Sequence, residues 1–71
     1  MYFAEFCEHW KFSIGGRVRV YINDNSKPAY DMGLGSFFRI GYNWTLGGYE
    51  ITELRTHFKK DGALYIIKLR G

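Results

Sequence analysis

Few residues of this sequence have the types and spacing that catalysis requires. Cys7 and His9 lie two positions apart, and His57 sits among basic residues in the segment RTHFKK. A nucleophilic thiolate and its imidazole base come from distant chain segments, so closeness in sequence is no support for such a pair. One cysteine and two histidines also match no zinc spacing. We therefore predict a non-enzymatic protein with no metal and no cofactor.

Basic and aromatic side chains are the stronger signal. In residues 16–24, GRVRVYIND, three β-branched residues alternate with Arg17, Arg19 and Tyr21, which predicts a strand with both arginines on its outer face. The same parity places basic and aromatic side chains of later segments on this face. The predicted nucleic-acid-binding residues are Arg17, Arg19, Tyr21, Phe37, Arg39, Arg55, Lys68 and Arg70.

Such a face has the composition of a single-stranded nucleic-acid platform. Cations neutralise phosphates and release counterions, and flat rings stack on bases. The net charge of +3 permits a polyanionic partner without requiring one. A plain solvated face is the alternative, because basic residues also keep sheets soluble and block pairing at their edges.

A second set of candidates lies in residues 29–37, AYDMGLGSF, which we interpret as a loop because two glycines stand within three positions. Its unusually apolar members are Tyr30, Met32, Leu34 and Phe37. They indicate either a flap over one end of a barrel or a contact for a protein partner.

The aromatic residues favour the protein partner. Six Phe, six Tyr and two Trp exceed what a core of this size needs, and exposed aromatics are common hot spots of binding. We predict a small binding module that recognises a protein partner, or a second copy of itself as a dimer, through the sheet face and residues 29–37. Nucleic-acid binding by the basic, aromatic face is the alternative.

Turn signals divide the central part of the chain into extended segments. The turn formers of residues 23–28, NDNSKP, end the first strand. A second strand is predicted over residues 36–44, SFFRIGYNW, followed by a turn at residues 45–48. Its predicted core side chains are Phe38, Ile40, Tyr42 and Trp44, which leaves Phe37 and Arg39 outside.

Two further strands are predicted in the last third of the chain. Residues 49–54 are extended, and because Leu54 falls out of parity, a β-bulge or a strand end is expected near Glu53. A short helix over residues 51–58 is the alternative. Asp61-Gly62 predicts a hairpin turn before the last strand, which is expected to be covered on both sides in its first half. The side chains predicted to share one face of that strand are Tyr65, Ile67 and Leu69.

The N-terminal segment, residues 2–12, allows two interpretations. Phe3, Phe6, Cys7 and Trp10 have the spacing of an amphipathic helix, which we favour. As a strand, the segment would place Tyr2, Ala4, Phe6, Trp10 and Phe12 on one face.

Together these elements predict one domain over residues 1–71, mainly β, with four or five strands in a small curled antiparallel sheet. The strand–GG–strand–DG–strand order of residues 37–70 resembles the outline of an SH3-like barrel. No apolar run is long enough to span a bilayer, so no membrane partner is expected. No small-molecule substrate is expected either. One free cysteine and no export signal suggest the cytoplasm, and a small phage or mobile-element regulator would have this composition.

Overall fold

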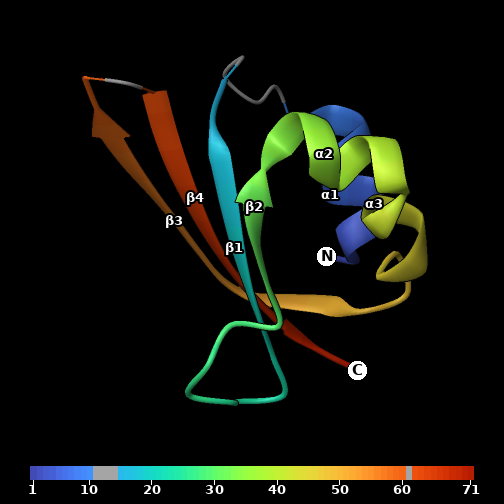
Figure 1. The fold of residues 1–71 in the computed structure, drawn as a ribbon. Coiled ribbons are helices and arrows are strands. Elements are labelled where there is room, and N and C mark those ends of the chain that lie inside the picture. Colours follow the sequence, from blue (N-terminus) through green and yellow to red (C-terminus); the bar gives the residue numbers. More distant parts are fainter. Residues whose placement is uncertain (11–14, 61) are drawn as a thin grey trace.

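Strands form one layer of the molecule and helices the other (Figure 1). The structure is a computed structural model, and it describes residues 1–10, 15–60 and 62–71. In chain order the elements are α1 (Phe3–His9), β1 (Arg17–Ile22), β2 (Tyr30–Gly33), α2 (Leu34–Ile40), α3 (Tyr42–Thr45), β3 (Glu50–Lys59) and β4 (Gly62–Arg70). The mainly β class is thus confirmed.

The sheet is mixed and open, with the strand order β2-β1-β4-β3. β1 pairs antiparallel with β2 and parallel with β4, and β3 pairs antiparallel with β4. A wholly antiparallel sheet is therefore wrong, and the sheet does not close into a barrel. The physical reason is that β1 and β4 are distant in sequence, so nothing in their local patterns indicates their parallel pairing.

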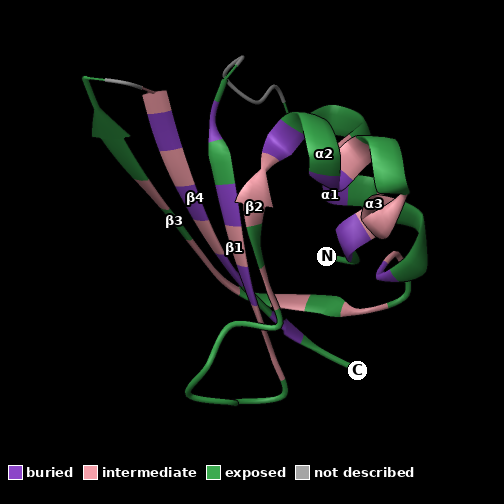
Figure 2. Ribbon diagram, in the orientation of Figure 1, coloured by how far each residue is buried: buried purple, intermediate pink, exposed green. Residues whose placement is uncertain are grey.

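The helices cover only one face of the sheet, and the core lies between the two layers (Figures 1 and 2). Val18 and Val20 of β1 point into it, as do Tyr65, Ile67 and Leu69 of β4, in agreement with the predicted alternation. The helical layer contributes Phe3, Phe6, Leu34, Phe37 and Leu46. Leu64 and Ile66 are only half-buried on the other face, so the first half of the last strand is not covered on both sides.

The favoured N-terminal helix is confirmed for the residues that the structure describes. Phe3 and Phe6, one helical turn apart, are buried in the core, and Cys7 is half-buried beside them. The backbone N–H groups of Phe3 and Ala4 donate to the carbonyls of Tyr49 and Gly47, at 2.8 and 3.2 Å, which ties α1 to the segment before β3. Lys11 and Phe12, the end of the alternative strand, lie outside the described residues.

The predicted strand over residues 36–44 is wrong, because these residues belong to α2 and α3. Leu34, Phe37 and Phe38 have the helical spacing i, i+3, i+4, and α2 turns all three toward the core. The core assignment is consequently inverted for three residues: Ile40 is 60% exposed and Trp44 is 73% exposed, whereas Phe37 is buried. Gly41 ends α2 with a φ of 92°, in the left-handed region where glycine is favoured, and α3 follows at once.

The predictions for the last third of the chain agree better with the structure. β3 is a strand rather than a helix, and its register shifts between Ile51 and Glu53, where the sequence predicts a bulge. The hairpin turn at Asp61-Gly62 lies partly outside the described residues, but β3 and β4 pair antiparallel on both sides of it. Residues 29–37, by contrast, are not a loop, since they contain β2 and the start of α2. No helix of the described segments is long and apolar enough to cross a membrane.

Candidate functional site

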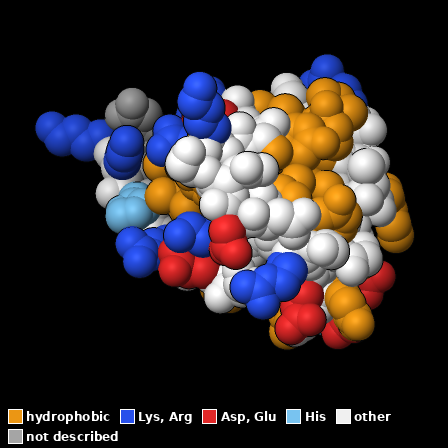
Figure 3. All heavy atoms as spheres, turned by 90° about the horizontal axis from the view of Figure 1, so that it is seen from below, with side chains coloured by type: hydrophobic (Ala, Val, Ile, Leu, Met, Phe, Trp, Pro, Cys, Tyr) orange, Lys and Arg blue, Asp and Glu red, His pale blue; other side chains and the backbone are white. Residues whose placement is uncertain are grey.

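The sheet face that the helices leave uncovered carries most of the cationic side chains of the strands. We call it the open face. Cross-strand register defines it, because residues directly opposite each other in a sheet project to the same side. Its charged and half-buried members are Arg17, Arg19, Tyr21, Asp31, Glu50, Glu53, Arg55, His57, Lys59, Leu64, Ile66, Lys68 and Arg70. Viewed from below, the blue Lys and Arg side chains gather mainly on the side of β3 and β4, and orange hydrophobic ones on the side of the helices (Figure 3).

One carboxylate holds two arginines at the β1–β2 side of the open face. Asp31 accepts a hydrogen bond from Arg17 Nη2 on Oδ1 and another from Arg19 Nε on Oδ2, each at 3.1 Å. Arg19 and Asp31 are directly opposite each other in the register of β1 and β2. The hydrogen bond from Arg17 and the charges of both arginines lower the pKa of Asp31 below its usual value of 3.8. Two fixed cations therefore share one anion.

A second cluster of the same composition lies at the β3–β4 side. Glu53 Oε2 is 3.0 Å from Arg55 Nε and 3.7 Å from Lys68 Nζ. Glu53 lies opposite Lys68, which the bulge at Ile51/Glu53 makes possible by shifting the register of β3. Each cluster thus has one more cation than anions, and Lys59 adds another positive charge at the end of β3.

Between the clusters lies an apolar strip along β4. Leu64 is opposite Arg17 on β1 and His57 on β3, and Ile66 is opposite Arg19 on β1 and Arg55 on β3. Neighbouring strands are about 4.8 Å apart, so two rows of cations flank this strip with a separation of roughly 10 Å. Half-buried Tyr21 follows Arg19 in the β1 row and lies opposite Lys68, so it borders the strip at the Ile66 end. The result is a trough with an apolar floor and cationic walls.

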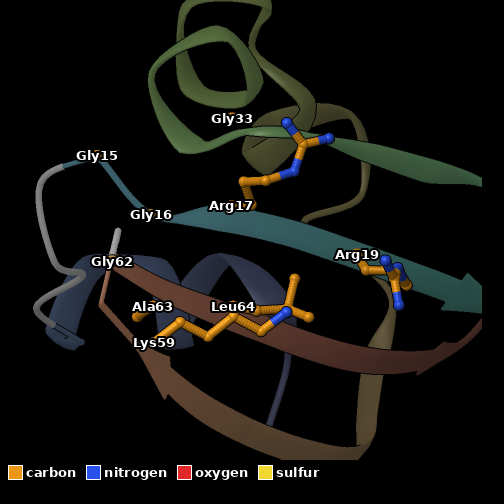
Figure 4. Close-up of a pocket in the computed structure, with 9 residues that line it drawn as sticks. All are labelled: Gly15, Gly16, Arg17, Arg19, Gly33, Lys59, Gly62, Ala63 and Leu64. Atoms are coloured by element: carbon orange, nitrogen blue, oxygen red, sulfur yellow. The ribbon is translucent and has the colours of Figure 1, made fainter.

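The surface is hollowed at both ends of this trough. One hollow of about 510 Å³ is lined by Arg17, Arg19, Lys59 and Leu64 together with four glycines and Ala63. Figure 4 shows Arg17 and Arg19 projecting from β1 and Lys59 from β3. A second hollow of about 300 Å³ is lined by Tyr21, Asn25, Ser26, Glu53, Arg55, Ile66 and Lys68. Glycines line one end of the first hollow, so no side chain fills that end.

The structure brings six of the eight predicted nucleic-acid-binding residues together on the open face: Arg17, Arg19, Tyr21, Arg55, Lys68 and Arg70. The other two lie elsewhere. Arg39 is exposed on α2, in the layer that covers the opposite face. Phe37 was expected outside but has no exposed surface, because α2 turns it into the core.

The predicted protein-binding residues are core or next to it. Leu34 and Phe37 are buried, and Met32 is half-buried on the helix-covered side of the sheet. Tyr30 packs its ring against those of Phe37 and Tyr42, with centroids 6.4 and 4.2 Å apart. These side chains stabilise the fold, and the expected adaptable loop is not present at this position.

Sequence reasoning missed several members of the trough. The alternation of Glu53, Arg55, His57 and Lys59 could have placed Lys59 on the same face as Arg55. No local signal could have placed Leu64 and Ile66 between the cations, since that position depends on the parallel pairing of β1 with β4.

The residues considered for catalysis form no reactive arrangement. Burial raises the pKa of the Cys7 thiol to about 11, so the thiol is protonated at neutral pH. Among the residues that the structure describes, no three His, Cys, Asp or Glu side chains are grouped so as to hold a metal ion. Comparisons with protein-family models, with curated proteins and with solved structures gave no match to this chain.

Proposed function

We propose that the protein binds single-stranded nucleic acid along the open face. The observation that carries this proposal is the trough: cations of β1 and β3 flank Leu64 and Ile66, with Tyr21 at one end. It combines a positively charged groove for the backbone with a surface for the bases, the two parts that sequence-tolerant single-strand binding requires.

Electrostatics supports this proposal more than it supports a solvated face alone. The open face carries six cationic side chains against the carboxylates of Asp31, Glu50 and Glu53, and Arg70 Nη2 also lies 3.9 Å from Asp24 Oδ2. Asp31 and Glu53 each contact two of these cations, so each of the two clusters keeps a net charge of +1. Both hollows lie on this one face, where low-dielectric walls strengthen the attraction of a polyanion.

The apolar floor favours a single strand over a duplex. A duplex has its phosphates outside and the faces of its bases stacked inside. Leu64, Ile66 and Tyr21 would therefore make few apolar contacts with it. An unpaired strand can lay its bases on these side chains, and stacking on an aromatic ring contributes about 1–3 kcal/mol per base. Recognition of a protein through residues 29–37 is less well supported, because Leu34 and Phe37 are buried.

The test is a titration of short single-stranded and duplex oligonucleotides, followed by fluorescence anisotropy at about 50 and 200 mM salt. Four phosphate contacts would weaken single-strand binding roughly 50-fold over this range, since the logarithm of affinity falls by about 0.7 per contact and per decade of salt. Duplex of the same sequence is expected to bind more weakly. Absence of binding at the lower salt concentration would exclude the proposal.

Matched arginine variants locate the site. Arg19→Ala and Arg55→Ala remove one cation from each side of the trough and are expected to lower the salt slope by about 0.7 each. Arg39→Ala removes the same side chain from α2 and is expected to leave affinity unchanged. An equal loss of affinity in all three variants would mean that binding depends only on net charge, and it would contradict a site on the open face.

A further inference from the structure

The free edge of β3 is self-complementary. β3 is an outer strand of the sheet, with β4 on its only paired side along Glu53–Lys59. Met1 and Tyr2 cover the other side only at the beginning of the strand, where the N–H of Ile51 donates to the Met1 carbonyl at 2.9 Å and Tyr2 bridges to Glu50. Among the described residues, no strand covers the edge beyond the bulge, and an exposed edge of this length pairs readily with another strand.

The hydrogen-bonding direction of the edge follows from the register. The carbonyl of Leu69 accepts from Asn23 N–H at 2.9 Å, on the side of β1. Because backbone groups alternate along β4, those of Lys68, Ile66 and Leu64 point toward β3. There Ile66 lies opposite Arg55, and Leu64 lies opposite His57. The backbone groups of Leu54, Thr56 and Phe58 consequently point away from β4, at the free edge.

From this edge we infer that two copies of the chain associate through β3, antiparallel to each other, about a two-fold axis at Thr56. Such an axis pairs residues that are equally distant from Thr56 on either side. Thr56 then faces its own copy, and Leu54 faces Phe58 of the second copy. These pairs exchange about six backbone hydrogen bonds across the interface, two for each hydrogen-bonded pair.

Pairing about this axis brings complementary side chains opposite each other on both faces of the sheet. On the open face, Glu53 and Lys59 are each three positions from Thr56, so each Glu53 faces Lys59 of the second copy. Arg55 faces His57 of the second copy without an opposite charge. On the helix-covered side, Phe58 is 79% exposed in the single chain. Leu54 packs against the core, and in the dimer Phe58 of the second copy would pack against Leu54.

This symmetry favours a second copy over an unrelated peptide. A strand with only cations along its edge would repel its own copy, whereas β3 carries an anion and a cation at matched positions. The added apolar contact also increases the buried apolar surface, which is small in a chain this short. The inference concerns association only and does not depend on nucleic-acid binding.

Sedimentation equilibrium from low to several hundred micromolar protein tests the interface. The unchanged chain is expected to form dimers as concentration rises. Lys59→Glu makes both members of each pair acidic, and Glu53→Lys makes both members basic, so either variant alone places like charges opposite each other. Each is expected to weaken association roughly tenfold or more, since each dimer contains two such pairs. Lys27→Glu, the same charge change in the β1–β2 turn, is the control and is expected to associate normally.

Mixing the two charge variants is the decisive measurement. A heterodimer of Lys59→Glu with Glu53→Lys has two acidic positions on one strand facing two basic positions on the other. An equimolar mixture is therefore expected to recover the association that each variant loses. Thr56→Pro removes a backbone N–H at the free edge and is expected to abolish association while the circular dichroism spectrum is retained. A monomer at every concentration, or a mixture that associates no better than its components, would overturn the inference.

Discussion

Asp31 restrains two cations of the proposed binding trough. Its two carboxylate oxygens each accept from a different arginine of β1, at 3.1 Å. The same carboxylate repels an incoming phosphate, so it orders Arg17 and Arg19 and at the same time reduces the attraction of the face. The first effect is small where charges are solvent-exposed, and the second acts directly at the proposed site.

We predict that Asp31→Asn increases affinity for single-stranded oligonucleotides about two- to fivefold, because one repulsive charge is removed while Arg17 and Arg19 remain. Anisotropy titration at low salt measures this change. Glu5→Gln, the equivalent neutralisation at an exposed position of α1, is the control and should have no effect. An unchanged or lower affinity for Asp31→Asn would show that phosphates do not approach this cluster.

The same variant gives a pH dependence of stability. The pKa of Asp31 is lowered in the folded protein, so its ion pairs stabilise the fold above the usual pKa of 3.8 and lose that contribution as pH falls through the lowered value. Urea unfolding should therefore show the unchanged chain more stable than Asp31→Asn by less than about 1 kcal/mol at neutral pH. The difference should shrink as pH falls below 3.8 and disappear once the Asp31 carboxylate is protonated in the folded chain.

Cys7 should react slowly in the folded protein. Burial raises the pKa of its thiol from 9.0 to about 11, which lowers the thiolate fraction near neutral pH by a factor on the order of 100. We expect the rate with a chromogenic disulfide reagent to be lower than that of a free thiol by at least this factor. Denaturant should restore the full rate, and a fast reaction of the native chain would contradict the burial of Cys7.

At the scale of elements, two glycines of the α2–α3 segment have opposite roles. Gly41 joins the two helices with a φ of 92°, while Gly35 lies inside α2, where a Cβ added to it would meet nothing within 4 Å. Gly41→Ala is expected to destabilise by about 1–2 kcal/mol, because alanine is strained in the left-handed region. Gly35→Ala is expected to stabilise by up to about 1 kcal/mol, because alanine favours the helix.

Thermal unfolding measures both glycine variants, and a change of 1 kcal/mol shifts the midpoint of so small a domain by roughly 4–8 °C. The pair also tests the helices themselves. If residues 36–44 were a strand, Gly35→Ala would not stabilise the chain and Gly41→Ala would not carry this penalty.

Two phenylalanines of equal size separate the core from the edge. Phe37 of α2 is completely buried, whereas Phe58 of β3 is 79% exposed. We expect Phe37→Ala to lower the free energy of unfolding by about 3–5 kcal/mol, a large part of the stability of a chain this short. Phe58→Ala should change it by less than about 0.5 kcal/mol when the chain is monomeric. Urea titration at low protein concentration compares them directly.

At the scale of the whole molecule, the helices of the described residues lie on one side of the sheet and leave the other side uncovered (Figure 1). Association through β3 would join two open faces into one continuous surface, with the Arg55–His57 pairs at its centre and the Glu53–Lys59 pairs further out along the seam. An oligonucleotide long enough to cross both faces should then bind roughly tenfold or more tightly than one that fits a single face, because the second contact is intramolecular.

Thr56→Pro tests this combined behaviour. The variant should keep the affinity for the short oligonucleotide and lose the gain for the long one, since each open face stays intact while the dimer is prevented. Anisotropy titration with both lengths provides the measurement. An equal gain with length in the variant would mean that one chain accommodates the longer strand by itself.

Local sequence patterns predicted the elements whose side-chain period was unambiguous. The alternation of Val18, Val20 and Ile22 identified β1, and the out-of-parity Leu54 located the bulge of β3. The strand prediction for residues 36–44 was wrong because aromatic and aliphatic residues at consecutive positions fit a period of two and a period of 3.6 equally well. The structure has the helical period, because Leu34 and Phe37 lie on one face of α2 and pack into the core against the sheet.

The sequence alone determined which side chains alternate along β1 and β4, and therefore which cations share a side of each strand. Only the tertiary structure decided that these sides coincide on one uncovered face, with Leu64 and Ile66 between Arg17, Arg19 and Arg55. Alternation is a property of consecutive residues, whereas strand order and the covered face depend on burying apolar surface between segments far apart in the chain. The trough and the free edge of β3 both arise from that second, non-local choice.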